Sequence, residues 1–329
     1  MPAFDGPTIE LGPMHWILLS VASALLLGVY DAAKKWSVRD NAVPIVLLCS
    51  VSIGAGLYLP LVVWSHLASG TIPFDSFVVG SLSWRDHGLV AGKSVLVGAS
   101  WTLAFSALKH LPLSIAAPIR ASSPFWTIVV AVGFLGERPT AIQWTGMFVV
   151  LVGFWRFTLV GKMEGIRFAR DRSVYLMVAA TLLGACSSIY DKWLLQHAGF
   201  QPVTLQAWFT IYLVPVMVPL AGWWYRHDRP RRDATIDIET RTGKRGQPFH
   251  WRWSIAVVSP LLIVADWFYF VALSDPSAMV SVVSVVRRCS VVIALVFGAK
   301  ALDESNFRAK AICVAVILVG VLMLTWTPV

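Results

Sequence analysis

Charged side chains are scarce in this 329-residue chain. Asp, Glu, Lys and Arg together make up 14% of the residues, whereas apolar residues make up 57%. A soluble globular domain averages about 25% charged residues. A soluble helical protein of this composition would have too little polar surface to cover its outside. The shortage of charge therefore argues against a soluble protein and favours helices that are surrounded by lipid.

Residue patterns that would hold a metal or a nucleotide are also missing. Cys49, Cys186, Cys289 and Cys313 lie within apolar runs, none has CxxC spacing, and no His/Cys cluster accompanies them. We expect buried thiols, and their spacing gives no sign of disulfides. The sequence also lacks a Gly-rich phosphate loop and a nucleophile–base pair. It therefore predicts neither an enzyme nor a bound cofactor or metal ion.

Long apolar runs take the place of charge. A helix needs about 20 mostly apolar residues to cross a membrane. Ten runs of that length centre on 14–33, 43–64, 89–108, 113–135, 141–160, 174–195, 203–225, 253–273, 278–299 and 307–326. The runs do not alternate as the strands of a membrane barrel would. The predicted fold is an all-α polytopic membrane protein with ten transmembrane helices.

Part of the sequence recurs at a fixed spacing. Four residues reappear as the same residue type 167 positions later: Arg120 as Arg287, Ser123 as Ser290, Glu137 as Glu304, and Gly153 as Gly320. The pair Tyr30-Asp31 reappears as Tyr190-Asp191. Duplication of an apolar unit is typical of secondary transporters. It predicts a first five-helix repeat at 14–160, a linker at 161–172 and a second repeat at 173–327.

Five helices is an odd number, so the second repeat must insert with the opposite orientation. The repeats would then be inverted, related by a pseudo-two-fold axis in the membrane plane. Under that symmetry Arg120 and Arg287 both fall near mid-membrane, while the acidic residues diverge to opposite mouths. We expect the residues near the mouths to act in gating or coupling: Asp31, Lys34, Asp191, Glu137 and Glu304. Lys34 lies three residues after Asp31 and could pair with it, whereas the sequence offers Asp191 only its neighbour Lys192.

The net charge of +9 is distributed unevenly. With ten helices, the loops on one side carry 20 Lys and Arg, and the other side carries only Arg85, Lys93, Arg138 and Lys192. Basic residues are retained in the cytoplasm during insertion. We therefore expect an inner (cytoplasmic) membrane protein with both termini outside the cytoplasm. Its basic loops would bind anionic lipid headgroups, not nucleic acid.

Charged residues deep in the predicted helices are the main candidates for a site. A charge at the helix centre costs about 2.5–3.5 kcal/mol on insertion scales, so it persists only where it is paired or faces water. The deep charges are Arg120, Arg287, Arg288 and Asp266. Guanidinium groups offer planar bidentate donors to carboxylate or phosphate, which favours an anion site. The alternative is internal pairing, because Asp266 and Arg287 fall at similar depths.

Hydroxyl groups and aromatic rings near these charges could complete a substrate site. The candidates are Ser123, Ser290, Tyr30, Tyr190, Trp101 and Trp267. Packing is the alternative role for the two tryptophans. Most of the other tryptophans fall near predicted helix ends, where an aromatic belt contacts the lipid headgroups. Gly146 and Gly153 share one face of their helix, as Cys313 and Gly320 do, which predicts that the fifth and tenth helices pack closely against their neighbours or against each other.

Two stretches resemble a known transporter repeat. Residues 107–154 begin with Ala-Leu-Lys, continue through a small-residue and proline region to Leu-Gly-Glu at Glu137, and end with Gly146 and Gly153. Residues 272–321 follow the same plan with Asp303-Glu304. Both resemble the EamA-type repeat of the drug/metabolite transporter (DMT) superfamily, and the segment GVYDAAK at 28–34 resembles its first-helix motif. The resemblance implies a site between helices 1, 3 and 4 and their counterparts 6, 8 and 9.

The resemblance implies transport but discriminates poorly between substrates, since members carry amino acids, nucleotide sugars, organophosphates, drugs and lipid-linked groups. Together with the deep arginines, it predicts a secondary active transporter of a small anionic organic metabolite that works by alternating access, as a monomer or homodimer. One alternative is a flippase for an anionic lipid or lipid-linked headgroup. Another is a non-transport membrane subunit or enzyme. Many bacterial members are drawn with both termini in the cytoplasm, and here the charge count predicts the reverse.

The predicted orientation can be tested with reporters fused after Val329. A fluorescent protein that matures only in the cytoplasm should stay dark, whereas alkaline phosphatase, which is active only after export, should be active. The reason is the retention of the basic loops in the cytoplasm. A bright fluorescent fusion would reverse the assignment.

Overall fold

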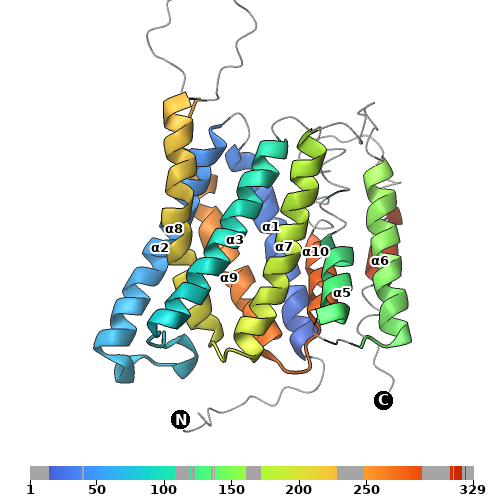
Figure 1. Ribbon diagram of the computed structural model, residues 1–329, viewed down its shortest axis with the longest axis horizontal. Coiled ribbons are helices and arrows are strands. Elements are labelled where there is room, and N and C mark those ends of the chain that lie inside the picture. The colour runs from blue at the N-terminus through green and yellow to red at the C-terminus, as the bar shows by residue number, and fades with distance from the viewer. Residues whose placement is uncertain are drawn as a thin grey trace, which may run out of the picture.

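The computed structural model describes residues 15–38, 41–108, 119, 123–134, 136, 138–160, 172–227, 248–290, 312–313, 315–320 and 323. All regular elements among these residues are helices, and Figure 1 shows them as one bundle. The α-helices are α1 (His15–Val38), α2 (Val43–Leu67), α3 (Trp84–Leu108), α5 (Ser123–Phe134), α6 (Ala141–Val160), α7 (Arg172–Gln196), α8 (Pro202–His227), α9 (Trp253–Ser274) and α10 (Val280–Arg288). Two 3₁₀ turns, Ser69–Thr71 and Asp75–Phe77, lie between α2 and α3.

These helices coincide with the predicted apolar runs. Four of them, α2, α7, α8 and α9, are long and apolar enough over their described residues to cross a membrane. The remaining helices lie in the other predicted runs, and the helical residues 315–320 fall in the tenth. Apolar side chains account for this agreement, because a helix that is apolar on all sides is stable only when lipid or other helices surround it.

One boundary differs in a way that matters for the site. Helix α3 begins at Trp84, before the predicted start at residue 89. The Ser83 amide donates to the Asp86 carboxylate at 3.2 Å, and the Asp86 amide donates to the Ser83 hydroxyl at 3.3 Å. This reciprocal arrangement is a capping box, which stabilises a helix start among polar residues. The earlier start places Lys93 more deeply inside α3, so counting it among the surface charges of the charge-poor side was wrong.

The outer surface of the bundle carries apolar side chains suited to lipid. Tryptophans near helix ends are exposed, among them Trp36 (65%), Trp84 (93%) and Trp253 (81%). Trp16 and Trp224, which the sequence placed in the same belt, are buried at 4% and 7%. Trp16 belongs to the main apolar core. The belt prediction therefore holds for the exposed rings and is wrong for these two, because proximity to a helix end does not decide which way a side chain points.

All four cysteines are free thiols. Cys313 is buried, Cys49 and Cys289 are half-buried, and Cys186 is exposed. The expectation of four buried thiols is therefore correct only for Cys313. An apolar run places a residue within the membrane but does not say whether it faces the protein or the lipid.

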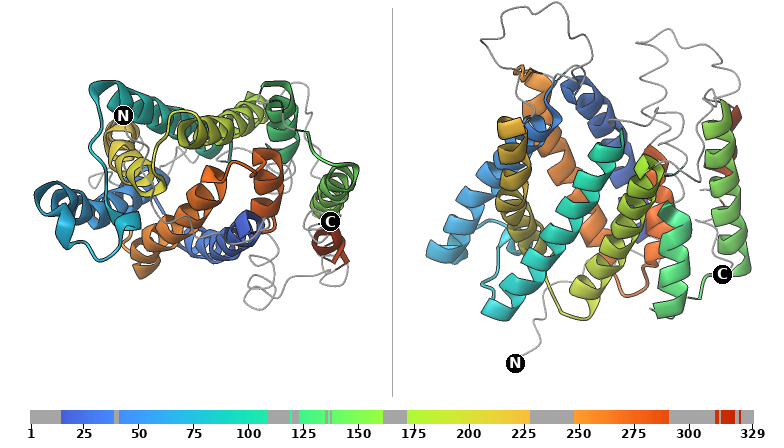
Figure 2. Two further views of the ribbon diagram at one scale, coloured as in Figure 1. Left: turned by 90° about the horizontal axis from the view of Figure 1, so that it is seen from below. Right: turned by 45° about the horizontal axis from the view of Figure 1, so that its top comes forward.

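The helices that pack along each other over much of their length come from different halves of the chain. Helix α1 packs along α9, α3 along α7, and α2 along α8, as the views in Figures 1 and 2 agree. Serines sit at these contacts: Ser23 donates to the Ala265 carbonyl at 2.7 Å, and Ser100 donates to the Ala180 carbonyl at 2.8 Å. Small residues and cross-helix hydrogen bonds hold membrane helices together where the hydrophobic effect cannot. The main core cluster lies near the end where α1 and α3 begin and α7 ends, which is lower in Figure 1 and is called the lower end below.

Helix α6 and residues 315–320 lie side by side at the edge of the bundle (Figure 2). A Cβ on Gly153 would lie 3.3 Å from the Ile317 amide nitrogen. A Cβ on Gly320 would lie 2.9 Å from both the Gly146 carbonyl oxygen and the Val150 amide nitrogen. The predicted close packing of the glycine-bearing helices against each other is thereby confirmed.

Gly320→Ala should destabilise the protein, since the added methyl group meets backbone atoms that cannot rotate away. Overpacking of this kind costs about 1–3 kcal/mol, and thermal unfolding of the purified protein in detergent would measure it. Gly222→Ala in α8 is the matched control, because a Cβ there meets nothing within 4 Å. Equal melting temperatures for the two variants would contradict the close contact.

Candidate functional site

A central cavity of about 280 Å³ lies between α1, α3, α7, α9 and α10. Its walls therefore come from both halves of the chain. Hydroxyl groups line much of it: Ser100, Ser123, Thr181, Ser187, Ser188, Ser284 and Ser290. A cavity of this size with a polar lining can hold a small organic solute.

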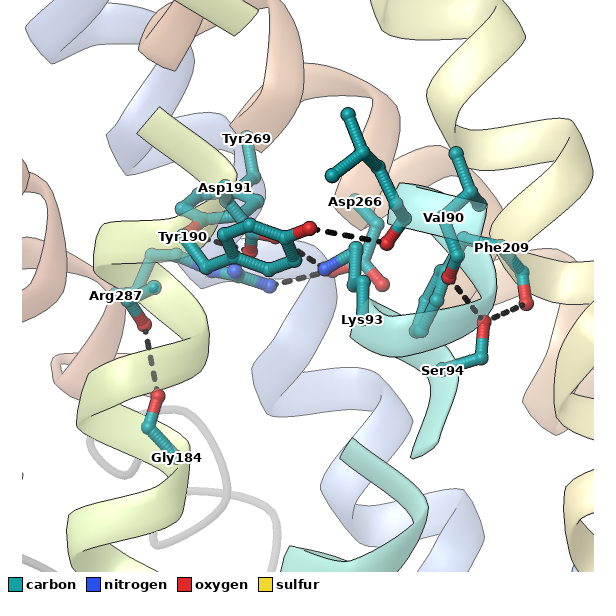
Figure 3. Close-up of polar contacts among 12 residues, drawn as sticks. Val90, Lys93, Ser94, Gly184, Tyr190, Asp191, Phe209, Asp266, Tyr269 and Arg287 are labelled. Atoms are coloured by element: carbon teal, nitrogen blue, oxygen red, sulfur yellow. Dashed lines mark hydrogen bonds and ion pairs between the residues drawn. The ribbon is translucent and has the colours of Figure 1, made fainter. Parts of the chain in front are cut away.

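Arg287 and Asp266 form an ion pair on the cavity wall. The Nη2 atom of Arg287 in α10 donates to Oδ1 of Asp266 in α9 at 2.6 Å (Figure 3). Their side chains are 19% and 17% exposed, so both reach the cavity. The Arg287 Nε atom is buried and has no hydrogen-bond partner. The internal pairing that the sequence left open is therefore present, and it leaves the Nε donor of the guanidinium unsatisfied.

Lys93 and Asp191 form a second, deeper ion pair. The Lys93 ammonium donates to Asp191 Oδ1, and the two residues are only 2% and 4% exposed (Figure 3). Lys93 is on α3 and Asp191 on α7, so the pair joins the two halves. Sequence reasoning gave Asp191 only Lys192 as a neighbour; its partner is 98 positions away. Burial of either charge alone would be costly, which explains why the two occur together.

Tyr269 lies between the two ion pairs. Its hydroxyl donates to Asp191 Oδ2 at 3.1 Å. The guanidinium carbon of Arg287 lies 4.0 Å from the centroid of the Tyr269 ring, a cation–π contact. Asp266 and Tyr269 are three residues apart on α9 and so share one face of that helix. The result is a continuous chain of contacts from Lys93 through Asp191, Tyr269 and Arg287 to Asp266.

Further cations face the same cavity. Lys34 of α1 and Arg288 of α10 belong to the lining. The Lys34 ammonium lies 5.5 Å from the Tyr30 ring centroid and 5.8 Å from that of Trp101. Among the described lining residues, four are cationic and two are carboxylates. The lining therefore carries an excess of positive charge, which attracts anions.

Most of the site residues that were predicted from the sequence and lie in the described part of the chain line the cavity, and two pack elsewhere. The cavity brings together Tyr30, Trp101, Ser123, Asp266, Arg287, Arg288 and Ser290, together with Lys34 and Asp191. Two aromatic candidates pack elsewhere: Tyr190 donates to the Leu89 carbonyl at 3.2 Å, and Trp267 stacks on Phe77 at 6.1 Å. The candidates Arg120, Glu137 and Glu304, and the side chain of Asp31, lie outside the described residues.

Sequence reasoning missed Lys93 and Tyr269. The Ser83-x-x-Asp86 capping signal could have placed Lys93 deeper in its helix than the predicted start at residue 89 does. The three-residue spacing from Asp266 could have placed Tyr269 on the face of α9 that carries the site. Nothing in the sequence indicates that Lys93 and Asp191 meet, because helices far apart in sequence are brought together only by packing.

Comparisons with known proteins agree with this architecture. Residues 14–159 match the EamA-like transporter family. A search of curated proteins gave no match. Solved structures do match, in 28 chains. One, described as "Crystal structure of protein", superposes with a TM-score of 0.70 at 15% sequence identity, and the alignment covers 94% of this chain and 98% of that chain. At this identity the likeness shows a shared fold.

The family match and the apolar helices lead to one conclusion about identity. The chain is a multi-pass membrane protein with a domain of the EamA-like transporter family, within the DMT superfamily, at residues 14–159.

Proposed function

We propose that this protein is a secondary active transporter of a small anionic organic metabolite across the cytoplasmic membrane. The observation that carries the proposal is the central cavity, whose walls come from both halves and hold the Arg287–Asp266 pair. A guanidinium on the wall of a water-filled cavity can bind a carboxylate or phosphate through two parallel hydrogen bonds. The excess of cations in the lining favours an anion over a cation.

The mechanism we propose is alternating access by two inverted five-helix repeats. The helix pairing supports this symmetry. If α1, α2, α3 and α5 correspond to α7, α8, α9 and α10, a two-fold axis requires each contact to recur with the partners exchanged. The α1–α9 contact does recur as α7–α3, and the α5–α7 contact recurs as α10–α1. Repeats paired in this way can rock against each other around a fixed central site.

Substrate binding would compete with Asp266 for Arg287. An anion that accepts hydrogen bonds from the guanidinium takes the place of the Asp266 carboxylate. A ligand can shift a conformational equilibrium only by as much as its affinity differs between the two states. The exchange supplies such a difference, because releasing Asp266 from α10 weakens the direct contact between α9 and α10. Arg120, the repeat counterpart of Arg287, would approach the anion from the first half.

The proposal extends to orientation and lipid contacts. Lys93 and Lys192, counted on the charge-poor side, are buried at 2% and 7%. Removing them from that count makes the charge asymmetry steeper, which supports termini outside the cytoplasm. The basic loops would then face the cytoplasm and bind anionic headgroups. In this orientation the lower end of the bundle faces away from the cytoplasm.

Ligand binding can be tested by thermal shift of the purified protein against small carboxylates, organic phosphates and short-chain lipid phosphates. An anion that binds should raise the melting temperature of the wild type, but not that of Arg287→Ala, which lacks the guanidinium. Asp266→Asn should bind the same anion more tightly, because it removes the competing carboxylate. Arg85→Ala, an exposed charge outside the cavity, is the control.

The outcomes separate the alternatives. Protection by lipid phosphates alone would support the flippase. Weaker anion binding by Asp266→Asn would contradict competition and leave the pair a structural one.

Uptake into proteoliposomes tests the roles of the two repeat-related arginines. Arg120→Ala and Arg287→Ala should each abolish uptake of the anion found by thermal shift, yet leave a monodisperse protein in detergent. Arg287→Lys should retain only a minor part of the uptake, because a lysine keeps the charge but loses the bidentate geometry. Loss of folding in both alanine variants would favour a purely structural role for the arginines.

A further inference from the structure

The central cavity has a closed floor at the lower end of the bundle. Lys93 and Asp191 are the lining residues of α3 and α7 nearest that end. One turn further down, Val90 and Leu194 are fully buried in the main apolar core and do not line the cavity. In the opposite direction, the lining of α3 continues to Ala104. On α3 and α7 the cavity lining therefore ends at the level of the Lys93–Asp191 ion pair.

The Lys93–Asp191 ion pair and the rings around it hold four helices in contact. Besides the Asp191 carboxylate, the Lys93 ammonium contacts the faces of two aromatic rings, at 4.3 Å from the Phe209 centroid and 5.2 Å from the Phe270 centroid. Lys93 thus joins α3 to α7, α8 and α9. The two side chains are only 2% and 6% exposed, so separating the charges leaves each one unpaired unless water enters. Opening the lower end requires that separation.

We propose that Lys93 and Asp191 form a lock that keeps the cavity closed at its lower end, and that Tyr269 links this lock to the occupancy of Arg287. The proposal deepens the transport function above, because it names the contact that must break when access alternates. It assigns Lys93 a positioning role: it does not bind substrate but holds α3 against α7. Figure 3 shows the chain of contacts.

Tyr269 connects the two ion pairs, one through its hydroxyl group and the other through its ring. Its hydroxyl holds Asp191 Oδ2 at 3.1 Å, and its ring supports the Arg287 guanidinium at 4.0 Å. An anion that draws Arg287 away from Asp266 also draws it off this ring. The ring then loses the contact that fixes its orientation, and the Asp191 carboxylate loses a hydrogen bond. Binding at Arg287 therefore weakens the lock without touching Lys93 or Asp191 directly.

The lock can be tested without a substrate, by the reactivity of single cysteines towards a polar maleimide. In a variant with its four native cysteines replaced by alanine, Ala278→Cys reports on the lower end and Ala104→Cys on the cavity wall at the other end. Ala278 is fully buried in the main core just before α10. Ala104 lines the cavity. Reaction rates are measured on purified protein in detergent.

Breaking the lock should change the two reporters in opposite directions. Lys93→Met and Asp191→Asn should each raise the labelling rate at Ala278→Cys about tenfold or more, since loss of a buried ion pair shifts a conformational equilibrium at least that far. Both should lower the rate at Ala104→Cys. Arg85→Met, which changes an exposed charge of α3 outside the cavity lining, should leave both rates unchanged. An unchanged rate at Ala278→Cys overturns the lock, and so does a rise at both reporters, which signifies unfolding.

The link through Tyr269 predicts a non-additive pair of substitutions. Arg287→Gln should raise labelling at Ala278→Cys when Tyr269 is present, and should add nothing once Tyr269→Phe has removed the hydroxyl. Additive effects would show that the two ion pairs act independently and would overturn the link. These measurements need no substrate, so their failure would leave the transport proposal standing, and failed uptake would leave the lock standing.

Discussion

A charge carried into the interior of a membrane bundle must meet an opposite charge, and this constraint organises the centre of the protein. The two ion pairs draw their members from α3, α7, α9 and α10, so they also fix how these helices lie against each other. An unpaired buried charge would be far less stable than the pair. The positions of four helices therefore depend on the partners of four charged side chains.

The two ion pairs differ in how far they are exposed to the cavity. Arg287 and Asp266 reach the cavity, whereas Lys93 and Asp191 are almost fully covered. Water and solutes can therefore compete at the first pair but not at the second. The exposed Arg287–Asp266 pair is therefore the one that a ligand can reach. The buried Lys93–Asp191 pair instead holds helices together. Tyr269 lies between the two pairs and contacts both, which is the basis of the link that we propose.

Much of the architecture could be predicted from periodicity and composition. The described helices fall within or overlap the predicted apolar runs, and the glycine spacing correctly brought α6 against residues 315–320. The Arg287–Asp266 pair could be proposed because both charges fall at similar depths. The depth of a residue in the membrane, however, does not indicate which way its side chain points. Tyr190 and Trp267 lie at plausible depths and point away from the cavity, and Trp16 points into the core.

The sequence by itself determined that this is a helical membrane protein with a few deep charges, because the length and apolarity of a segment decide whether it can cross a bilayer. Only the tertiary structure decided which charges meet. Lys93 and Asp191 lie in different halves of the chain, and no local pattern indicates their contact. It arises because α3 and α7 pack along each other, and packing is decided by the shapes of whole helix faces.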